Sequence, residues 1–137
     1  MKKAILLMLA GIFLSPVFLY SQKKFQKLDE VDNVTITYRW KQSKVLKKDS
    51  PLALFIKIKN ANEYAVKVEF TVDYFFDGMT KASSEKQNYC LKKGAAIMGK
   101  MKKSGFDSSG FTEEELFSDR FVLEVNEVAV GKVIKCK

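Results

Sequence analysis

The sequence predicts an all-β protein: an immunoglobulin-like sandwich of two antiparallel sheets, with about seven strands and one short helical turn. Three observations predict this fold class. Apolar and polar residues alternate in Leu52–Asn60 and Val66–Phe76, which is typical of strands with one buried face. Turn residues separate several further short strand-like segments. The only helical signal after the N-terminal region lies near Thr112–Ser118.

The stretch Leu52–Gly78 forms the centre of the predicted sandwich, as two strands joined by a polar turn. Asn60 and Asn62 supply the turn between the strands, and Asp77-Gly78 is a strong turn signal at the end of the second. Phe75 falls on the face opposite the core-facing positions. It either covers a second layer or a sheet edge, or it contacts a ligand or partner.

Residues 1–21 have the features of a bacterial secretory signal peptide. A lysine pair precedes the apolar run Ala4–Leu14, and Ser21 is a small residue before the expected cut. An uncleaved membrane anchor is the alternative, but Ala4–Tyr20, which has a proline inside, is at the short limit for spanning a bilayer. We expect residues 22–27 to form a flexible lead-in and residues 28–137 to form the sandwich domain. The protein is then exported: periplasmic, cell-surface or secreted, with no stable membrane span after cleavage.

Further strands are expected on both sides of this centre. Val34–Trp40 alternates clearly, and Trp40, the only tryptophan, is expected in the core. Shorter strands are expected from Met79 onward, over Tyr89–Leu91 and over Ala95–Met101. In the last of these, Gly99 is expected to mark a bulge or a close approach.

The last segment, Phe121–Cys136, changes its apolar face part of the way along. Phe121 and Leu123 hold odd positions, whereas Val128 and later residues hold even ones. A slip of one residue moves every side chain of a strand to the other face. The sequence therefore predicts either a bulge in one long strand or a tight hairpin near Asn126-Glu127.

The helical signal has the features of a capped helix start. Thr112 is at the expected N-cap, and Glu115 follows at the spacing of a capping box. Acidic residues in a first turn also interact favourably with the helix dipole. Glu113–Glu115 are therefore expected to be helix-start residues rather than metal ligands or catalytic carboxylates.

The two cysteines, Cys90 and Cys136, are expected to form a disulfide, because an even number of cysteines in an exported protein is typical of one. Closing this loop stabilises by about 4 kcal/mol in the chain-entropy model. The chain contains no histidine, which removes the commonest general base and zinc ligand. We expect no cofactor, no metal site and no enzymatic activity.

The chain is basic, with a formal net charge of +8, and nearly all of its cations are lysines. These lysines form either a solvated face or a surface that attracts an anionic envelope polysaccharide. With two arginines, the bidentate contacts that favour phosphate and bases are scarce, so no nucleic-acid partner is expected. The candidate ligand or partner contacts are Phe75, Lys47, Lys48, Lys92 and Lys93.

The sequence IKIKNANEYAVKVEFTVDYFFDG, within Leu52–Gly78, resembles a hairpin of small bacterial secreted immunoglobulin-like, adhesion-type β-sandwich domains. This resemblance implies a non-catalytic binding or spacer module and transfers no functional residue. We therefore expect a secreted or cell-envelope module that mediates protein interaction or adhesion. The partner is expected to be another envelope or secreted protein, or an anionic surface polysaccharide. The alternative is a carbohydrate-binding or enzyme-inhibitor-like secreted protein.

Overall fold

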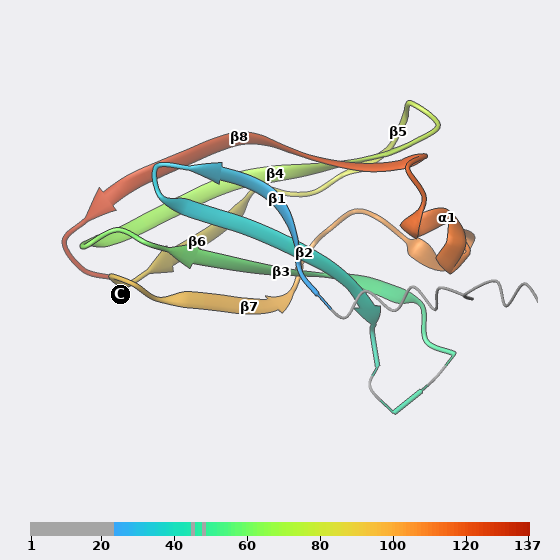
Figure 1. The fold of residues 1–137 in the computed structure, drawn as a ribbon, viewed down its shortest axis with the longest axis horizontal. Helices are drawn as coiled ribbons and strands as arrows, with labels where there is room; N and C mark the ends of the chain where they lie inside the picture. Colours follow the sequence, from blue (N-terminus) through green and yellow to red (C-terminus); the bar gives the residue numbers. More distant parts are fainter. Residues whose placement is uncertain (1–23, 45, 48) are drawn as a thin grey trace, which may run out of the picture.

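The computed structural model describes residues 24–44, 46–47 and 49–137. The expected signal peptide, residues 1–21, and the candidate contact Lys48 lie outside the described residues. The described chain is mostly strand, arranged as two antiparallel sheets that face one another (Figure 1). The predicted all-β sandwich is thereby confirmed at the level of the two packed sheets.

The first sheet has the strand order β1-β2-β3-β7. Its strands are β1 (Gln26–Val31), β2 (Val34–Gln42), β3 (Leu52–Asn60) and β7 (Ala96–Lys100). The second sheet is built on the long strand β4, which pairs with β8 on one side and with both β5 and β6 on the other. Its strands are β4 (Ala65–Phe76), β5 (Met79–Ser83), β6 (Gln87–Leu91) and β8 (Phe121–Val133).

The core lies between the two sheets and follows the alternation in the sequence. Alternate residues of β2, β3 and β4 face the core, and most of them are buried, including Ile36, Ile58 and Phe70. Trp40 is 4% exposed and packs against the rings of Phe106 and Phe121. The expected place of Trp40 in the core is confirmed.

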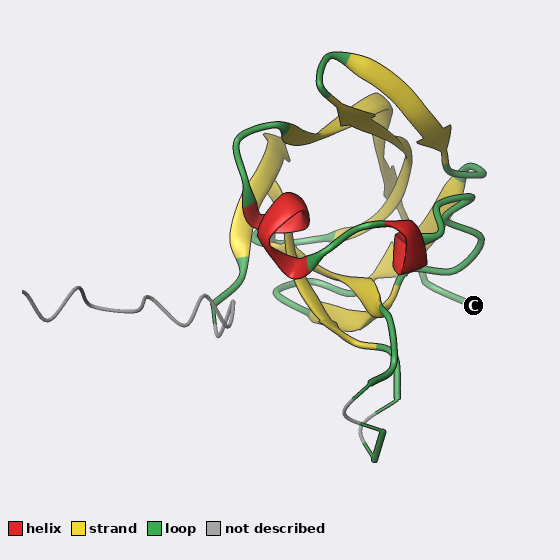
Figure 2. Ribbon diagram, turned by 90° about the vertical axis from the view of Figure 1, so that its right-hand side faces the viewer, coloured by secondary structure: helices red, strands yellow, loops and turns green. Residues whose placement is uncertain are grey.

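One end of the sandwich is covered by two short helical segments, η1 (Ser108–Gly110) and α1 (Glu113–Phe117). Figure 2, viewed roughly along the strands, shows both segments lying across this end. The capping box that the sequence predicts is present: Thr112 Oγ1 accepts from Glu115 N at 3.2 Å, and Thr112 N donates to Glu115 Oε2 at 2.9 Å. The cap starts α1 and turns Leu116 into the core.

A single-residue bulge in β8 explains the change of apolar face in the last segment. Glu69 pairs with Ala129, whereas Thr71 pairs with Asn126, so β8 contains one extra residue here. Glu127 takes up the extra length with φ of +52°, in the left-handed region. Of the two alternatives, the bulge is therefore correct and the hairpin is wrong.

The sequence predicts about seven strands, whereas the described residues form eight, and the strand not predicted is β1. Gln26 and Lys27 belong to this strand rather than to a flexible lead-in. β1 escapes the alternation pattern because it is an edge strand with few buried residues and a register shift after Lys27. A signal for it does exist: Asp32 and Asn33 both have positive φ and form a two-residue turn between Val31 and Val34.

The cysteine pair is the one that the sequence predicts. Cys90 on β6 and Cys136 after β8 lie at disulfide distance, and they are 46 positions apart in the chain. The bond fastens the C-terminal end to the edge strand of the second sheet. Within the described residues, no helix has the length and apolar character that a membrane crossing requires.

Candidate functional site

A pocket of 330 Å³ lies on one side of the sandwich, between β6 and β7. β6 is at an edge of the second sheet and β7 is at an edge of the first, and the two strands belong to no common sheet. On the opposite side of the sandwich, β1 contacts β8. The pocket therefore marks the side on which the two sheets leave the core accessible.

The pocket is closed at both ends by the chain itself. The turn at residues 92–95 links β6 to β7 at one end. At the other end, residues 101–103 cross back to the second sheet, where Gln87 Nε2 donates to Lys102 O at 3.0 Å and Glu85 N donates to Lys103 O at 3.1 Å. The opening is therefore about as long as the five-residue strand β7.

The floor of the pocket is apolar and belongs to the core. It includes Ile56 and Ile58 of β3, Ile97 of β7 and Tyr89 of β6. The Tyr89 ring stacks on Phe70, with ring centroids 6.0 Å apart. Its hydroxyl donates to Gln87 Oε1 at 3.2 Å, and burial raises the pKa of this hydroxyl. At this floor a ligand meets aliphatic side chains and one aromatic ring, while the polar side chains of Gln87, Asn88 and several lysines line the rest of the pocket.

Gly99 opens the pocket above Ile56. Its register opposite Ile56 places it on the core-facing side of β7, and the pairing with β3 continues through it without a bulge. A Cβ atom added at Gly99 would have no heavy atom within 4 Å. The expectation of a bulge or a close approach at Gly99 is therefore wrong. The glycine leaves a gap where a larger side chain would close the sandwich.

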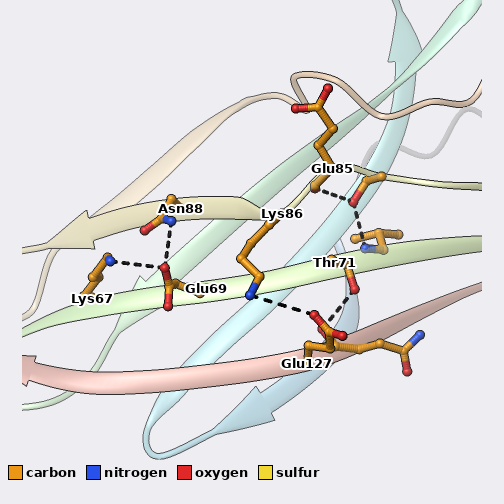
Figure 3. A network of polar contacts seen from close by, with 10 residues as sticks. Lys67, Glu69, Thr71, Glu85, Lys86, Asn88 and Glu127 are labelled. Carbon is orange, nitrogen blue, oxygen red and sulfur yellow. Dashed lines mark hydrogen bonds and ion pairs between the residues drawn. The ribbon is translucent and has the colours of Figure 1, made fainter.

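Four lysines line the pocket, and they differ in their partners. Lys103 forms an ion pair with Glu85 at 2.7 Å, which raises the pKa of the lysine. Lys86 reaches across β4 to Glu127 on β8, 3.9 Å away (Figure 3). No acidic partner is present for Lys100 and Lys102 in the part of the chain that the structure describes. These two ammonium groups are available to an anionic ligand.

The edge of β7 that faces the pocket carries backbone groups with no strand beside them. Asn60 N donates to Ala95 O, and Met101 N donates to Leu54 O, so the odd-numbered residues of this segment bond to β3. In an antiparallel pair the intervening residues direct their N–H and C=O groups to the other side. For β7 these are Ala96, Met98 and Lys100. Such an edge can accept a further strand.

The outer face of the first sheet is basic beside this edge. Strands β2, β3 and β7 contain no aspartate or glutamate. Their outward positions hold five cations: Arg39, Lys41, Lys57, Lys59 and Lys100. The outer face of the second sheet is different, because Lys67 pairs with Glu69 at 3.1 Å and Asn88 also donates to Glu69 (Figure 3). These contacts hold the pKa of the Glu69 carboxyl below its usual range.

The structure does not bring the predicted lysine contacts together. Lys47 is exposed in the loop that leads into the start of β3. Lys92 and Lys93 are exposed in the turn at the other end of that nine-residue strand, about 30 Å away at the usual rise per residue. Lys93 is also engaged, in an ion pair with Glu63. Lys92 and Lys93 lie in the turn after β6 and are not among the residues that line the pocket, and Lys47 lies at a different end of the molecule.

Phe75 lies half-buried on the outer face of the second sheet, as its position in the sequence predicts. Its cross-strand neighbours are Val122 on β8 and Thr80 on β5. Val122 is 42% exposed, so the two side chains form a small apolar surface on that face. This surface is on a different face of the molecule from the pocket.

Comparison of the chain with protein-family models, curated proteins and solved structures finds no match in any of the three. The function is therefore inferred from the chain's own residues. The pocket itself was missed by the sequence analysis. Its one local signal is the glycine of β7, which interrupts an otherwise apolar core-facing row.

Proposed function

We propose that this protein is an exported, non-catalytic binding module that mediates protein interaction or adhesion in the cell envelope or outside the cell. The observation that carries the proposal is the pocket between β6 and β7, with its apolar floor and its lysine-rich rim. Its 330 Å³ falls within the range of about 300–1,000 Å³ typical of ligand sites. A gap in the core beside an unpaired strand edge is costly for a sandwich unless something fills it.

A binding role is supported over catalysis by the side chains around the pocket. The chain has no histidine. Glu85, whose backbone N–H bonds to Lys103 O, is held in an ion pair with the Lys103 side chain. The hydroxyl of Tyr89 is a poor acid, because burial raises its pKa. The groups that a ligand meets are suited to apolar contact and charge attraction.

The proposal includes two further parts: that the protein is exported, and that its sandwich is of the immunoglobulin-like type. Residues 1–21 supply the features of a signal peptide. The bond between Cys90 and Cys136 suits an oxidising compartment. Two facing antiparallel sheets are the architecture of the immunoglobulin-like sandwich.

The proposal is tested by crosslinking the tagged protein in the cells that make it and identifying captured proteins by mass spectrometry. The deciding variant is Gly99→Phe, which fills the pocket. Gly131→Phe is its matched control, since Gly131 is also a strand glycine with open space around a Cβ atom, but lies outside the pocket. We expect a protein partner captured by the wild type and by Gly131→Phe, and lost with Gly99→Phe. Equal capture by all three proteins would contradict the assignment of the site.

A second function, carbohydrate binding or enzyme inhibition, is favoured by one observation, the apolar surface of Phe75 and Val122. Aromatic side chains at a surface can anchor a ligand. Under this alternative, Phe75→Ala abolishes retention on the ligand while Gly99→Phe leaves it unchanged. The pocket proposal requires the reverse result.

A further inference from the structure

We infer that the occupant of this site is an extended polypeptide segment in which acidic and apolar residues alternate, added as a strand to the edge of β7. This inference rests on the proposed function, because it names the partner chemistry for the same pocket. Three features of the described residues specify it: a backbone edge, a gap in the core and the basic outer face of β2, β3 and β7.

The backbone edge specifies an extended segment. Ala96, Met98 and Lys100 direct their N–H and C=O groups away from β3, so a strand lying along β7 can bond to all three residues. β7 is exposed along this edge, and Met98 is 61% exposed. The closed ends of the pocket limit the bonded part to about the five residues of β7.

The gap in the core specifies apolar side chains at alternate positions of the added strand. Residues of that strand opposite Ile97 and Gly99 point to the core-facing side, because paired residues share a face. There they enter the pocket above Ile56 and Ile58 and in front of Tyr89. Gly99 leaves the room for a branched aliphatic side chain.

The charge of the outer face specifies acidic side chains at the intervening positions. Residues of the added strand opposite Met98 and Lys100 point to the outer face of the first sheet. That face holds Lys57, Lys59 and Lys100 and has no acid on β2, β3 or β7. Lys102 adds a cation without an acidic partner at the end of the pocket, within the described residues. Opposite charges on neighbouring strands stabilise their pairing.

The same charges disfavour a second copy of this chain as the occupant. Pairing two β7 edges would place two lysine-rich outer faces side by side, and like charges on adjacent strands are destabilising. An anionic polysaccharide satisfies the basic face, but it has no apolar alternation for the pocket and no backbone amides for the edge. A polypeptide uses all three features.

The test uses protein expressed from the complete chain and a blocked synthetic peptide of about nine residues that alternates glutamate and valine. Binding is followed by NMR of the protein amides. We expect the amide signals of Ala96, Met98 and Lys100 to shift and to become protected from hydrogen exchange. Replacing glutamate by lysine in the peptide is expected to weaken binding about tenfold or more. N-methylation of the peptide nitrogens that face β7 is expected to weaken it by a similar factor of about ten.

The glycine variants give the internal control. Gly99→Phe is expected to abolish peptide binding, and Gly131→Phe is expected to leave it unchanged. Absence of shifts at the β7 amides would overturn the inference, as would equal binding of the N-methylated or lysine peptide. Saturable binding of a sulfated polysaccharide without peptide binding would replace it by the polysaccharide alternative, and a dimer seen in sedimentation would replace it by self-pairing.

Failure here is distinguishable from failure of the proposed function. If crosslinking in cells depends on Gly99 but the peptide does not bind, the pocket remains the partner site and the alternating strand is wrong. If crosslinking is indifferent to Gly99→Phe, the pocket itself is not the site.

Discussion

At the scale of single residues, Asn60 joins two turns at one end of the sandwich. It is fully buried at the end of β3. Its Nδ2 donates to Tyr64 O at 2.8 Å and to Lys92 O at 3.1 Å, and its Oδ1 accepts from Asn62 N at 2.9 Å. The β3–β4 turn and the turn that closes the pocket are therefore held by one carboxamide. The sequence predicts its role as a turn residue but not its contact with Lys92, 32 positions away.

Replacing this carboxamide by a carboxylate, Asn60→Asp, is expected to lower the free energy of unfolding by about 3 kcal/mol or more at neutral pH. The change removes the two donors and places a charge against two carbonyl oxygens. Burial raises the folded-state pKa of the introduced carboxyl above its unfolded value. The part of the loss that comes from the buried charge is therefore recovered as the pH falls through the folded pKa toward about 4.

Urea unfolding between pH 4 and pH 8, roughly the range that spans the titration, measures the effect of Asn60→Asp. Asn33→Asp is the control, since Asn33 is exposed and its side chain makes one longer hydrogen bond, 3.3 Å to Asn62. This control is expected to change stability by less than about 0.5 kcal/mol. A variant Asn60→Asp as stable at pH 8 as the wild type would show that the carboxamide donors are not needed.

At the scale of elements, alternation predicts the strands that have one face in the core. β3 has the predicted bounds, Leu52–Asn60, and β4 begins one residue before the predicted Val66. β1 lacks this signal because both of its faces are partly exposed. Alternation predicts a strand where one face of the strand is buried and the other is exposed, because this difference in burial produces the alternation.

The position of the pocket follows from long-range strand pairing and not from local alternation. β6 and β7 are consecutive in the chain, yet they join different sheets, and each lies at an edge. Which edges face one another is decided by the pairing of β7 with β3 and of β6 with β4. These are long-range pairings that no local pattern specifies. Clustering in the sequence does not bring lysines together in the fold, and Lys47 and Lys92 accordingly lie near opposite ends of β3.

The bulge of β8 gives a prediction at the element scale, through two exposed glutamates of the same strand. Glu127 has φ of +52°, whereas Glu124 has ordinary strand geometry. Glu127→Gly is expected to raise the free energy of unfolding by about 0.5–1 kcal/mol, because glycine adopts the left-handed region without strain. Its exposed ion pair with Lys86, at 3.9 Å, contributes little.

Glu124→Gly is the matched control for this prediction. Glycine in an ordinary strand position is expected to destabilise by about 0.5–1 kcal/mol. Thermal or urea unfolding of both variants therefore gives changes of opposite sign. Two losses of equal size would contradict the left-handed conformation assigned to Glu127.

At the scale of the whole molecule, the two sides of the sandwich are closed in different ways. One side is closed by contact between β1 and β8. On the other side, the core is reached through the pocket, and the walls of the pocket, β6 and β7, are held in place by covalent and polar links at their ends. These links are the bond from Cys90 to Cys136, the turn held by Asn60, and the crossing segment, residues 101–103, whose Lys102 carbonyl is bonded to Gln87.

The crossing segment is itself fixed by a close backbone approach. Gly105 has φ of +67°, and a Cβ atom there would lie 2.6 Å from Ser83 O. The glycine therefore lets residues 101–107 pass close to the end of β5 and return the chain to the helical end. On the pocket side, β6 and β7 do not pair with each other. The sheets are therefore held together on this side by these links.

The disulfide gives the prediction that belongs to this scale. It closes a loop across 46 residues that contains β7, α1 and β8, so it limits the unfolded chain over about a third of its length. The double variant Cys90→Ser with Cys136→Ser is expected to lower the free energy of unfolding by about 4 kcal/mol. Dithiothreitol is expected to lower the wild-type free energy of unfolding by the same amount and to leave that of the double variant unchanged.

Because the core between β3 and β4 contains neither cysteine, the double variant should still fold, and its far-ultraviolet circular dichroism should match that of the wild type. A wild type whose urea midpoint is indifferent to dithiothreitol would show that the bond does not form in solution.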